Sequence, residues 1–161
     1  MLIAIYLVLC FLSRKTENET FKFTFEALPI LTAGFLMGPS AGAIVGGLGS
    51  LINQIGEYGI TPTTITWVLP HLVSGLFVGL FGKIKKYQYK LIEIIIVSII
   101  SSLLVTGLNL VAIYVDAVYY NYYSPAMLYA NLILKIVIGI SQAIVFSLIM
   151  PRIIDTFKKK I

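Results

Sequence analysis

The stretch FTFEALPILTAGFLMGPSAG, residues 23–42, places one carboxylate, two prolines and a series of glycines inside an otherwise apolar sequence. Proline disfavours a helical residue before it and glycine has a permissive backbone, so Gly38-Pro39 predicts a tight turn between two short helices. One long kinked helix is the alternative interpretation. Glu26 and Pro29 then mark the outer entrance of the first short helix, where a carboxylate meets the positive end of the helix dipole.

The whole chain has the composition of an integral membrane protein. It has 161 residues, of which 58% are hydrophobic and only 12% are charged, and its mean hydropathy is +0.95. Since a spanning helix needs about 20 residues, this length allows at most about six spans and excludes a second soluble domain. We therefore expect a single all-α transmembrane domain over residues 1–161, built as a compact bundle of six helices.

Six apolar segments predict the helices of this bundle. They lie at residues 1–12, in the two halves of 23–54, and at about 63–81, 91–115 and 125–150. At about 1.5 Å per residue, the first segment is too short to cross a hydrocarbon core of about 30 Å. We therefore expect that the native chain starts upstream of Met1.

Positive charges set the expected orientation. Seven of the twelve Lys and Arg residues lie in two clusters, 83–90 and 158–160, which flank hydrophobic segments and are separated by two spans. Both clusters therefore fall on one side, which the positive-inside rule identifies as the cytoplasm. Both termini are then cytoplasmic, and the loops 56–62 and 116–124 are outside. A lipid bilayer, and not nucleic acid, is the partner that this basic character indicates.

Glycines recur at a spacing of four residues in the second and third segments. Small residues at this spacing let helix backbones approach closely, which drives helix association in lipid. Two interpretations are open, namely packing inside the bundle and a docking face for another membrane subunit. The glycines concerned are Gly34, Gly38, Gly42 and Gly46.

Catalytic and metal-binding motifs are absent from the sequence. There is no H-E-x-x-H or G-x-S-x-G motif, and GLFGKIKK lacks the upstream glycine and the Ser or Thr of a phosphate-binding loop. One histidine and one cysteine provide no metal-ligand cluster or disulfide framework, and Cys10 is expected to be a packing residue. We predict a protein that is not an enzyme and that has no catalytic residue, metal or cofactor.

Polar residues on three predicted helices indicate a binding pocket. They gather in the outward halves of the segments 63–81, 91–115 and 125–150, whereas the inward halves are apolar. At about 100° per residue they fall on one face of each helix. This pattern describes a bundle with an outward-facing pocket that is closed at its inner end. The candidate pocket residues on these helices are Trp67, His71, Asn109, Asn131 and Lys135.

Lys135 is the most costly of these residues in a bilayer. It lies about 15 Å along its helix, near the bilayer centre, where an unpaired ammonium costs at least about 2.5–3.5 kcal/mol. We therefore expect it to face a partner or a water-filled cavity. The two interpretations are a structural ion pair with Glu26 or Asp116 and a counter-charge for an anionic ligand.

The other candidates have structural alternatives as well. Trp67 is either an interfacial anchor or a ligand contact, and His71 either bonds a carbonyl freed by Pro70 or contacts the ligand. Asn109 and Asn131 are either interhelical hydrogen-bonding residues or ligand contacts. Their clustering, rather than any single residue, predicts a binding site.

The segments FTFEALPILTAGFLMGPSAGAIVGGLG and TPTTITWVLPHLVSGLFVGLFG resemble the substrate-binding S components of energy-coupling factor (ECF) vitamin transporters, especially the folate-type group. The similarity covers residues 23–82 in sequence and the rest of the chain in architecture. It implies a subunit of the bacterial cell membrane that captures a vitamin from outside. It further implies docking on a transmembrane coupling subunit driven by two cytoplasmic ATPases, and a pocket built from the first outer loop and the outer ends of helices four to six.

The resemblance also implies roles for individual residues. Folate would place its carboxylates at Lys135, its pterin ring on Trp67 and its ring edge at Glu26 or an asparagine. Pantothenate, with one carboxylate, would suit Lys135 as well. The coupling face of the family uses small residues four apart on the first helix, for which Ala4, followed by Val8, is the candidate in this chain.

Two other functions are open on the sequence. A scaffold subunit of a cell-envelope or morphogenesis complex would use the glycine faces for partner helices and Lys135 for an internal ion pair. A self-sufficient facilitator would transport without a coupling subunit. Affinity for a water-soluble vitamin separates a transporter subunit from the scaffold, and uptake by liposomes that contain this chain alone would identify the facilitator.

Overall fold

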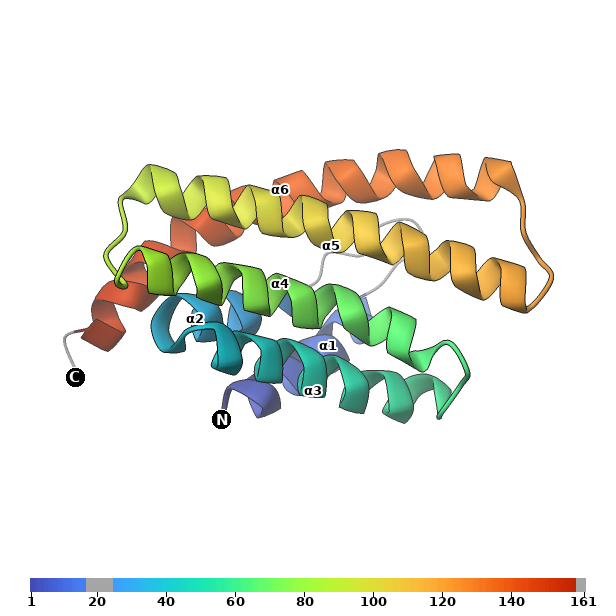
Figure 1. The fold of residues 1–161 in the computed structure, drawn as a ribbon, viewed down its shortest axis with the longest axis horizontal. Coiled ribbons are helices and arrows are strands. Elements are labelled where there is room, and N and C mark those ends of the chain that lie inside the picture. The colour runs from blue at the N-terminus through green and yellow to red at the C-terminus, as the bar shows by residue number, and fades with distance from the viewer. Residues whose placement is uncertain (17–24, 159–161) are drawn as a thin grey trace.

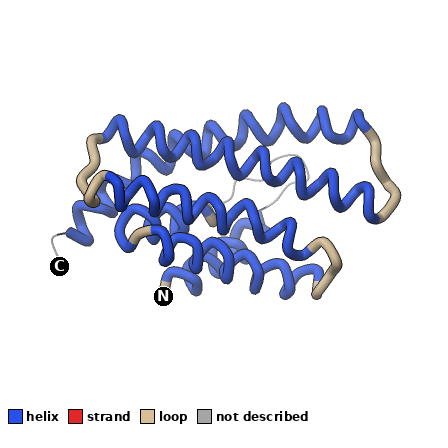
Figure 2. The backbone as a smooth tube through the Cα atoms, in the orientation of Figure 1, coloured by secondary structure: helices blue, strands red, loops and turns tan. Residues whose placement is uncertain are grey.

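The protein is a bundle of helices (Figure 1). The computed structural model describes the backbone of residues 1–16 and 25–158 and the side chains of residues 1–13, 25–124 and 135–156. The prediction of an all-α fold is confirmed, because this described backbone holds six helices and no strand (Figure 2). The helices are α1 (Leu2–Thr16), α2 (Ala27–Met37), α3 (Pro39–Tyr58), α4 (Thr64–Ile84), α5 (Leu91–Tyr119) and α6 (Pro125–Lys158).

Length, composition and surface together describe a membrane protein. Within the described residues, three helical segments are long and apolar enough to cross a membrane, namely Thr64–Ile84, Leu91–Tyr119 and Lys135–Thr156. Leu2–Ser13 and Ala27–Met37 are apolar but shorter. Large apolar side chains point outward along the bundle, as a surface surrounded by lipid tails allows.

Gly38 and Pro39 form the turn between α2 and α3. Gly38 has a φ of 92°, in the region that favours glycine, and its N–H donates to the carbonyl of Gly34 at 3.2 Å. Pro39 is the first residue of α3, where a missing N–H leaves no helical hydrogen bond unmade. The predicted turn between two helices is confirmed, and the single kinked helix is excluded. Of the two helices only α2 is short, with 11 residues, whereas α3 has 20.

The connections between helices gather at two ends of the bundle. The basic cluster 83–90 spans the end of α4 and the α4–α5 loop. This loop lies at the same end as the C-terminal part of α6, and the α3–α4 and α5–α6 loops lie at the other end (Figure 1). A Cβ placed on Gly38 would lie 2.6 Å from the hydroxyl of Tyr87 in the α4–α5 loop, so the α2–α3 turn also belongs to the basic end. The positive-inside argument requires this grouping of the basic segments.

Glycines hold α3 against α4. A Cβ on Gly42 would overlap the carbonyl group of Gly75, and a Cβ on Gly46 would overlap the carbonyl group of His71. Gly34 on α2 is also buried against α4. Backbones approach this closely only where side chains are absent, so helix contacts within the chain involve Gly34, Gly42 and Gly46 of the four-residue series, whereas Gly38 belongs to the turn.

Apolar clusters fill the bundle towards its basic end and between its first three helices. The larger cluster joins α2, α4, α5 and α6 and consists of Leu31, Phe35, Val78, Ile94, Val97, Phe146, Met150 and Ile154. The smaller one joins α1, α2 and α3 and consists of Tyr6, Cys10, Ile30, Ala33 and Val45. Ala4 and Val8 lie on the exposed side of α1. The helices are therefore packed together at the basic end, and the space for a cavity lies further towards the other end.

We expect Gly42→Ala to lower the apparent melting temperature of the purified protein or to prevent its recovery in monodisperse form. The new Cβ has no room beside Gly75, and overpacking of this kind costs about 1–3 kcal/mol or more. Gly56→Ala, also on α3 but with nothing within 4 Å of the new Cβ, is the matched control and should be neutral or stabilising by up to about 1 kcal/mol. Equal melting temperatures for the two variants would contradict the backbone contact.

Candidate ligand-binding site

A cavity of about 490 Å³, called the main cavity below, lies between α1, α3, α4, α5 and α6. This volume falls within the range of about 300–1,000 Å³ that is usual for small organic ligands. Its lining includes Thr61 from the α3–α4 loop and Tyr120 after the end of α5, so it reaches the end of the bundle opposite the basic loops. The lining residues are Tyr6, Cys10, Ser13, Glu26, Ser50, Asn53, Gln54, Glu57, Tyr58, Thr61, Thr63, Trp67, His71, Asn109, Asp116, Tyr120 and Lys135.

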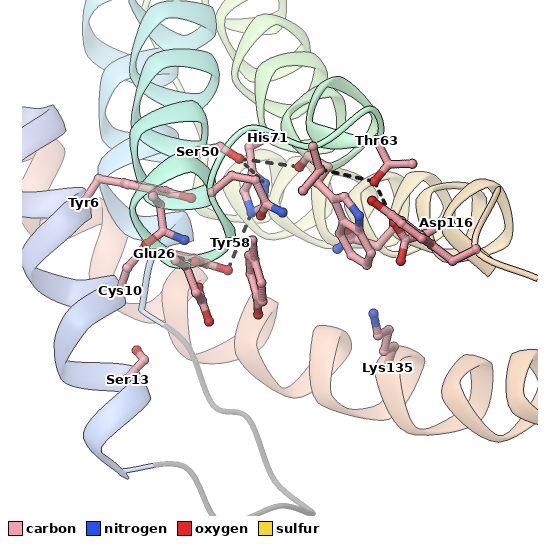
Figure 3. Close-up of a pocket in the computed structure, with 17 residues that line it drawn as sticks. Tyr6, Cys10, Ser13, Glu26, Ser50, Tyr58, Thr63, His71, Asp116 and Lys135 are labelled. Atoms are coloured by element: carbon pink, nitrogen blue, oxygen red, sulfur yellow. Dashed lines mark hydrogen bonds and ion pairs between the residues drawn. The ribbon is translucent and has the colours of Figure 1, made fainter. Parts of the chain in front are cut away.

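The fold brings most of the sequence-predicted site residues to this one cavity. Asn131 lies on α6, but its side chain is outside the described residues. The lining residues come from segments that are far apart in the sequence, and Figure 3 shows Lys135 extending from α6 towards the side chains on the other helices. The predicted residues that line the main cavity are Glu26, Trp67, His71, Asn109 and Lys135.

Glu26 and His71 form the floor of the main cavity. The Nε2 atom of His71 lies 3.5 Å from Oε1 of Glu26, and the thiol of Cys10 donates to Oε2 of Glu26 at 3.2 Å. Ser50 Oγ lies 3.5 Å from His71 Nδ1 (Figure 3). The carboxylate is therefore held by groups from α1 and α4, and Cys10 has a polar contact in addition to the packing role expected from the sequence.

Asp116 connects three parts of the chain at the far end of the main cavity. The Thr63 hydroxyl before α4 donates to Oδ1 of Asp116 at 2.6 Å, and the Tyr122 hydroxyl in the α5–α6 loop donates to Oδ2 at 2.5 Å. Each carboxylate oxygen thus accepts a hydrogen bond. Lys135 extends into the cavity on the side where Asp116 lies (Figure 3).

Two helices that sequence reasoning did not assign to the pocket also line it. Both carry hydrogen-bonding residues at the spacing of one helical face. This spacing is the sequence pattern by which α1 and α3 could have been assigned to the pocket. On α1 this spacing is i, i+4 and i+7, with Tyr6, Cys10 and Ser13. On α3 it is i, i+3, i+4 and i+7, with Ser50, Asn53, Gln54 and Glu57.

The wall of the main cavity is acidic. In the described part of the chain it carries three carboxylates, Glu26, Glu57 and Asp116, against one ammonium, that of Lys135. These four described side chains, counted without His71, have a formal charge of −2, from three negative charges and one positive. Among the described residues, no group of three or more His, Cys, Asp or Glu side chains could hold a metal ion. The wall therefore offers acceptors to hydrogen-bond donors and one cation to an acidic group.

We expect the pKa of Tyr122 to fall towards 10 in an Asp116→Asn variant. The hydrogen bond to Asp116, and secondarily burial, raise the pKa of the Tyr122 phenol above its usual value of 10.0. Because the pKa is raised in the folded state, this bond stabilises the protein below about pH 10 and the contribution is lost as the pH rises through the higher pKa. Phenolate absorbance, taken as the difference between proteins with and without Tyr122→Phe, measures the titration. An identical difference curve in the parent protein and in the Asp116→Asn variant would contradict the assignment.

Comparison with known protein families agrees with this geometry. The family described as ECF transporter, substrate-specific component, matches residues 1–154, which include all of α1 to α5 and most of α6. No curated protein matches the chain. Proteins of this family are substrate-binding subunits of ECF importers rather than enzymes, and they work with a small-molecule substrate and the ECF energising module. The chain belongs to the family of ECF transporter substrate-specific components.

Proposed function

We propose that this S component captures from outside the cell a water-soluble vitamin that carries a donor-rich aromatic ring and an acidic tail, for ATP-driven uptake. Folate is the first candidate. The observation that supports the proposal is the main cavity, in which Glu26, Trp67 and Lys135 line one space of about 490 Å³. These three side chains offer an acceptor, an aromatic surface and a cation to a single ligand.

Folate matches these groups one by one. The edge of its pterin ring presents adjacent N–H donors, which a carboxylate such as Glu26 accepts in parallel. Trp67 provides an aromatic surface for the ring, and Lys135 provides a counter-charge for the carboxylate tail. Pantothenate would satisfy Lys135 but has no aromatic ring for Trp67 and no paired donors for Glu26. The aromatic ring and the paired donors therefore favour folate over pantothenate.

The arrangement of the two ends supports an orientation in the bacterial cell membrane. The basic α4–α5 loop and the C-terminal part of α6 lie at one end, and the main cavity reaches the other end (Figure 1). In the proposed topology the chain crosses the membrane six times, the basic end and both termini are cytoplasmic, and the cavity opens outside. The helix α2 itself covers only the cytoplasmic half of its crossing. The coupling subunit and its two cytoplasmic ATPases are the proposed partners, and the exposed side of α1 with Ala4 and Val8 is the proposed contact with the coupling subunit.

The glycine contacts weaken the scaffold alternative. A scaffold would present its glycine faces to partner helices, whereas Gly34, Gly42 and Gly46 are buried against α4. A scaffold would also have no use for a polar cavity, because intramembrane ionisable groups are costly. A ligand-binding role accounts for both observations.

We expect the purified protein to bind folate, with a raised melting temperature, and Lys135→Ala to weaken that binding about tenfold or more. The variant removes a charge-assisted hydrogen bond, which is worth about 1.5–3 kcal/mol. Glu26→Gln should weaken binding as well, because an amide replaces one of the two acceptor oxygens by a donor. Lys83→Ala is the matched control, since Lys83 is an exposed lysine at the basic end and its loss should leave affinity unchanged.

Mass spectrometry of molecules that co-purify with the protein identifies the vitamin directly. Another bound vitamin with a donor-rich ring and an acidic tail would replace folate and keep the site assignment. A monodisperse protein whose melting temperature responds to no member of a vitamin panel would overturn the proposed function.

A further inference from the structure

A second cavity, of about 70 Å³, lies behind the floor of the main cavity and is called the inner cavity below. Glu26 and His71 line both cavities and separate them. The inner cavity lies between α2, α4, α5 and α6, and its wall includes Ser98, about two turns into α5 from the basic end. Polar groups therefore continue inward beyond the main cavity.

Some hydroxyl groups of the inner cavity are satisfied within the protein. The hydroxyls of Ser74 on α4 and Ser101 on α5 are 2.7 Å apart and share a hydrogen bond. Ser102 donates to the carbonyl of Gly139 on α6 at 2.7 Å. These bonds join α4, α5 and α6, three of the four helices that surround the cavity, so this part of its wall is defined by specific contacts.

Two other polar atoms of the same wall are not satisfied by such hydrogen bonds in the described part of the chain. Ser98 Oγ and Gln142 Nε2 are buried and have no hydrogen-bond partner among the described residues. Ser98 is only 2% exposed, so bulk solvent does not satisfy its hydroxyl. Buried polar groups of this kind lower the stability of the fold unless water or an ion satisfies their hydrogen-bonding capacity.

The inner cavity has the size and chemistry to hold water. An ordered water needs about 10–15 Å³ of accessible space and two to four polar partners. The cavity exceeds that volume, and its wall offers the Ser98 hydroxyl, the Gln142 amide and the carboxylate of Glu26. An amide N–H and hydroxyls beside one carboxylate suit a neutral molecule that both donates and accepts hydrogen bonds.

We propose that the inner cavity is a binding site for ordered water, which accepts a hydrogen bond from Gln142, bonds to the Ser98 hydroxyl and donates to Glu26. The water provides hydrogen-bond partners for Ser98 Oγ and Gln142 Nε2. It also contacts the carboxylate of Glu26 from the side opposite the main cavity. It thereby orients Glu26 and keeps it hydrated. This site does not depend on which ligand the main cavity takes.

Ser98→Ala tests the proposal through the sign of a melting-temperature change in the ligand-free protein. If water occupies the cavity, the variant removes one of its partners, and we expect the melting temperature to fall by about 2–4 °C. If the cavity is dry, the variant removes an unpaired buried hydroxyl and the melting temperature rises, which overturns the proposal. Gln142→Met is the second variant, with the same two outcomes, should Ser98→Ala fail to fold.

Ser147→Ala is the matched control. Ser147 is also 2% exposed, but its hydroxyl donates to the Ile144 carbonyl of its own helix at 2.7 Å, so its loss should change the melting temperature less than Ser98→Ala does. The parent protein is then compared in NaCl, KCl and choline chloride at equal ionic strength. Equal melting temperatures support water, whereas a rise specific to Na⁺ or K⁺ that Ser98→Ala abolishes would show a cation site and overturn the proposal.

Discussion

The contact between the backbones of α3 and α4 positions the rest of the structure. Helices gain little from apolar burial in lipid, so close van der Waals contact between backbones is what favours their association, and Gly42 and Gly75 permit it. The same two helices carry Ser50 on one side and Trp67 and His71 on the other. Ser50 Oγ lies within 3.5 Å of the Trp67 carbonyl oxygen and of the His71 ring because the two helices touch. The glycine contact thus sets the geometry of the cavity floor.

The shortness of α2 has an equally direct effect. Its 11 residues extend only about 16 Å from the turn at the basic end, which is about half of a hydrocarbon core. Glu26, just before α2, therefore stands at mid-depth in the proposed topology, deeper than the outer entrance at which the sequence analysis placed it. Lys135 lies on the other side of the main cavity, where Asp116 lies (Figure 3). Opposite charges from distant segments thus line one cavity, although each is costly alone.

Sequence reasoning succeeded where a local rule decides the structure. The Gly38-Pro39 turn follows from backbone preferences, and the polar faces of α4 and α5 follow from helical periodicity. The same periodicity on α3 is harder to recognise, because the glycines of that helix form a second pattern that indicates helix packing. The inner cavity could not be predicted, because Ser98 and Ser102 share one polar face and differ only in what α6 presents to them. Ser102 meets the carbonyl of Gly139, whereas Ser98 meets the cavity.

The charges of the main cavity explain why a non-enzymatic protein places so many ionisable groups in a bilayer. Carboxylates and an ammonium in one cavity balance part of each other's charge before a ligand arrives, which lowers the cost of an interior charge. A ligand with only an anionic group would match Lys135 but would face the excess of carboxylates. A ligand with only donor groups would match the carboxylates and gain nothing from the ammonium of Lys135. A molecule that carries both satisfies both walls at once, which is why the charge pattern supports the proposal of a bifunctional ligand.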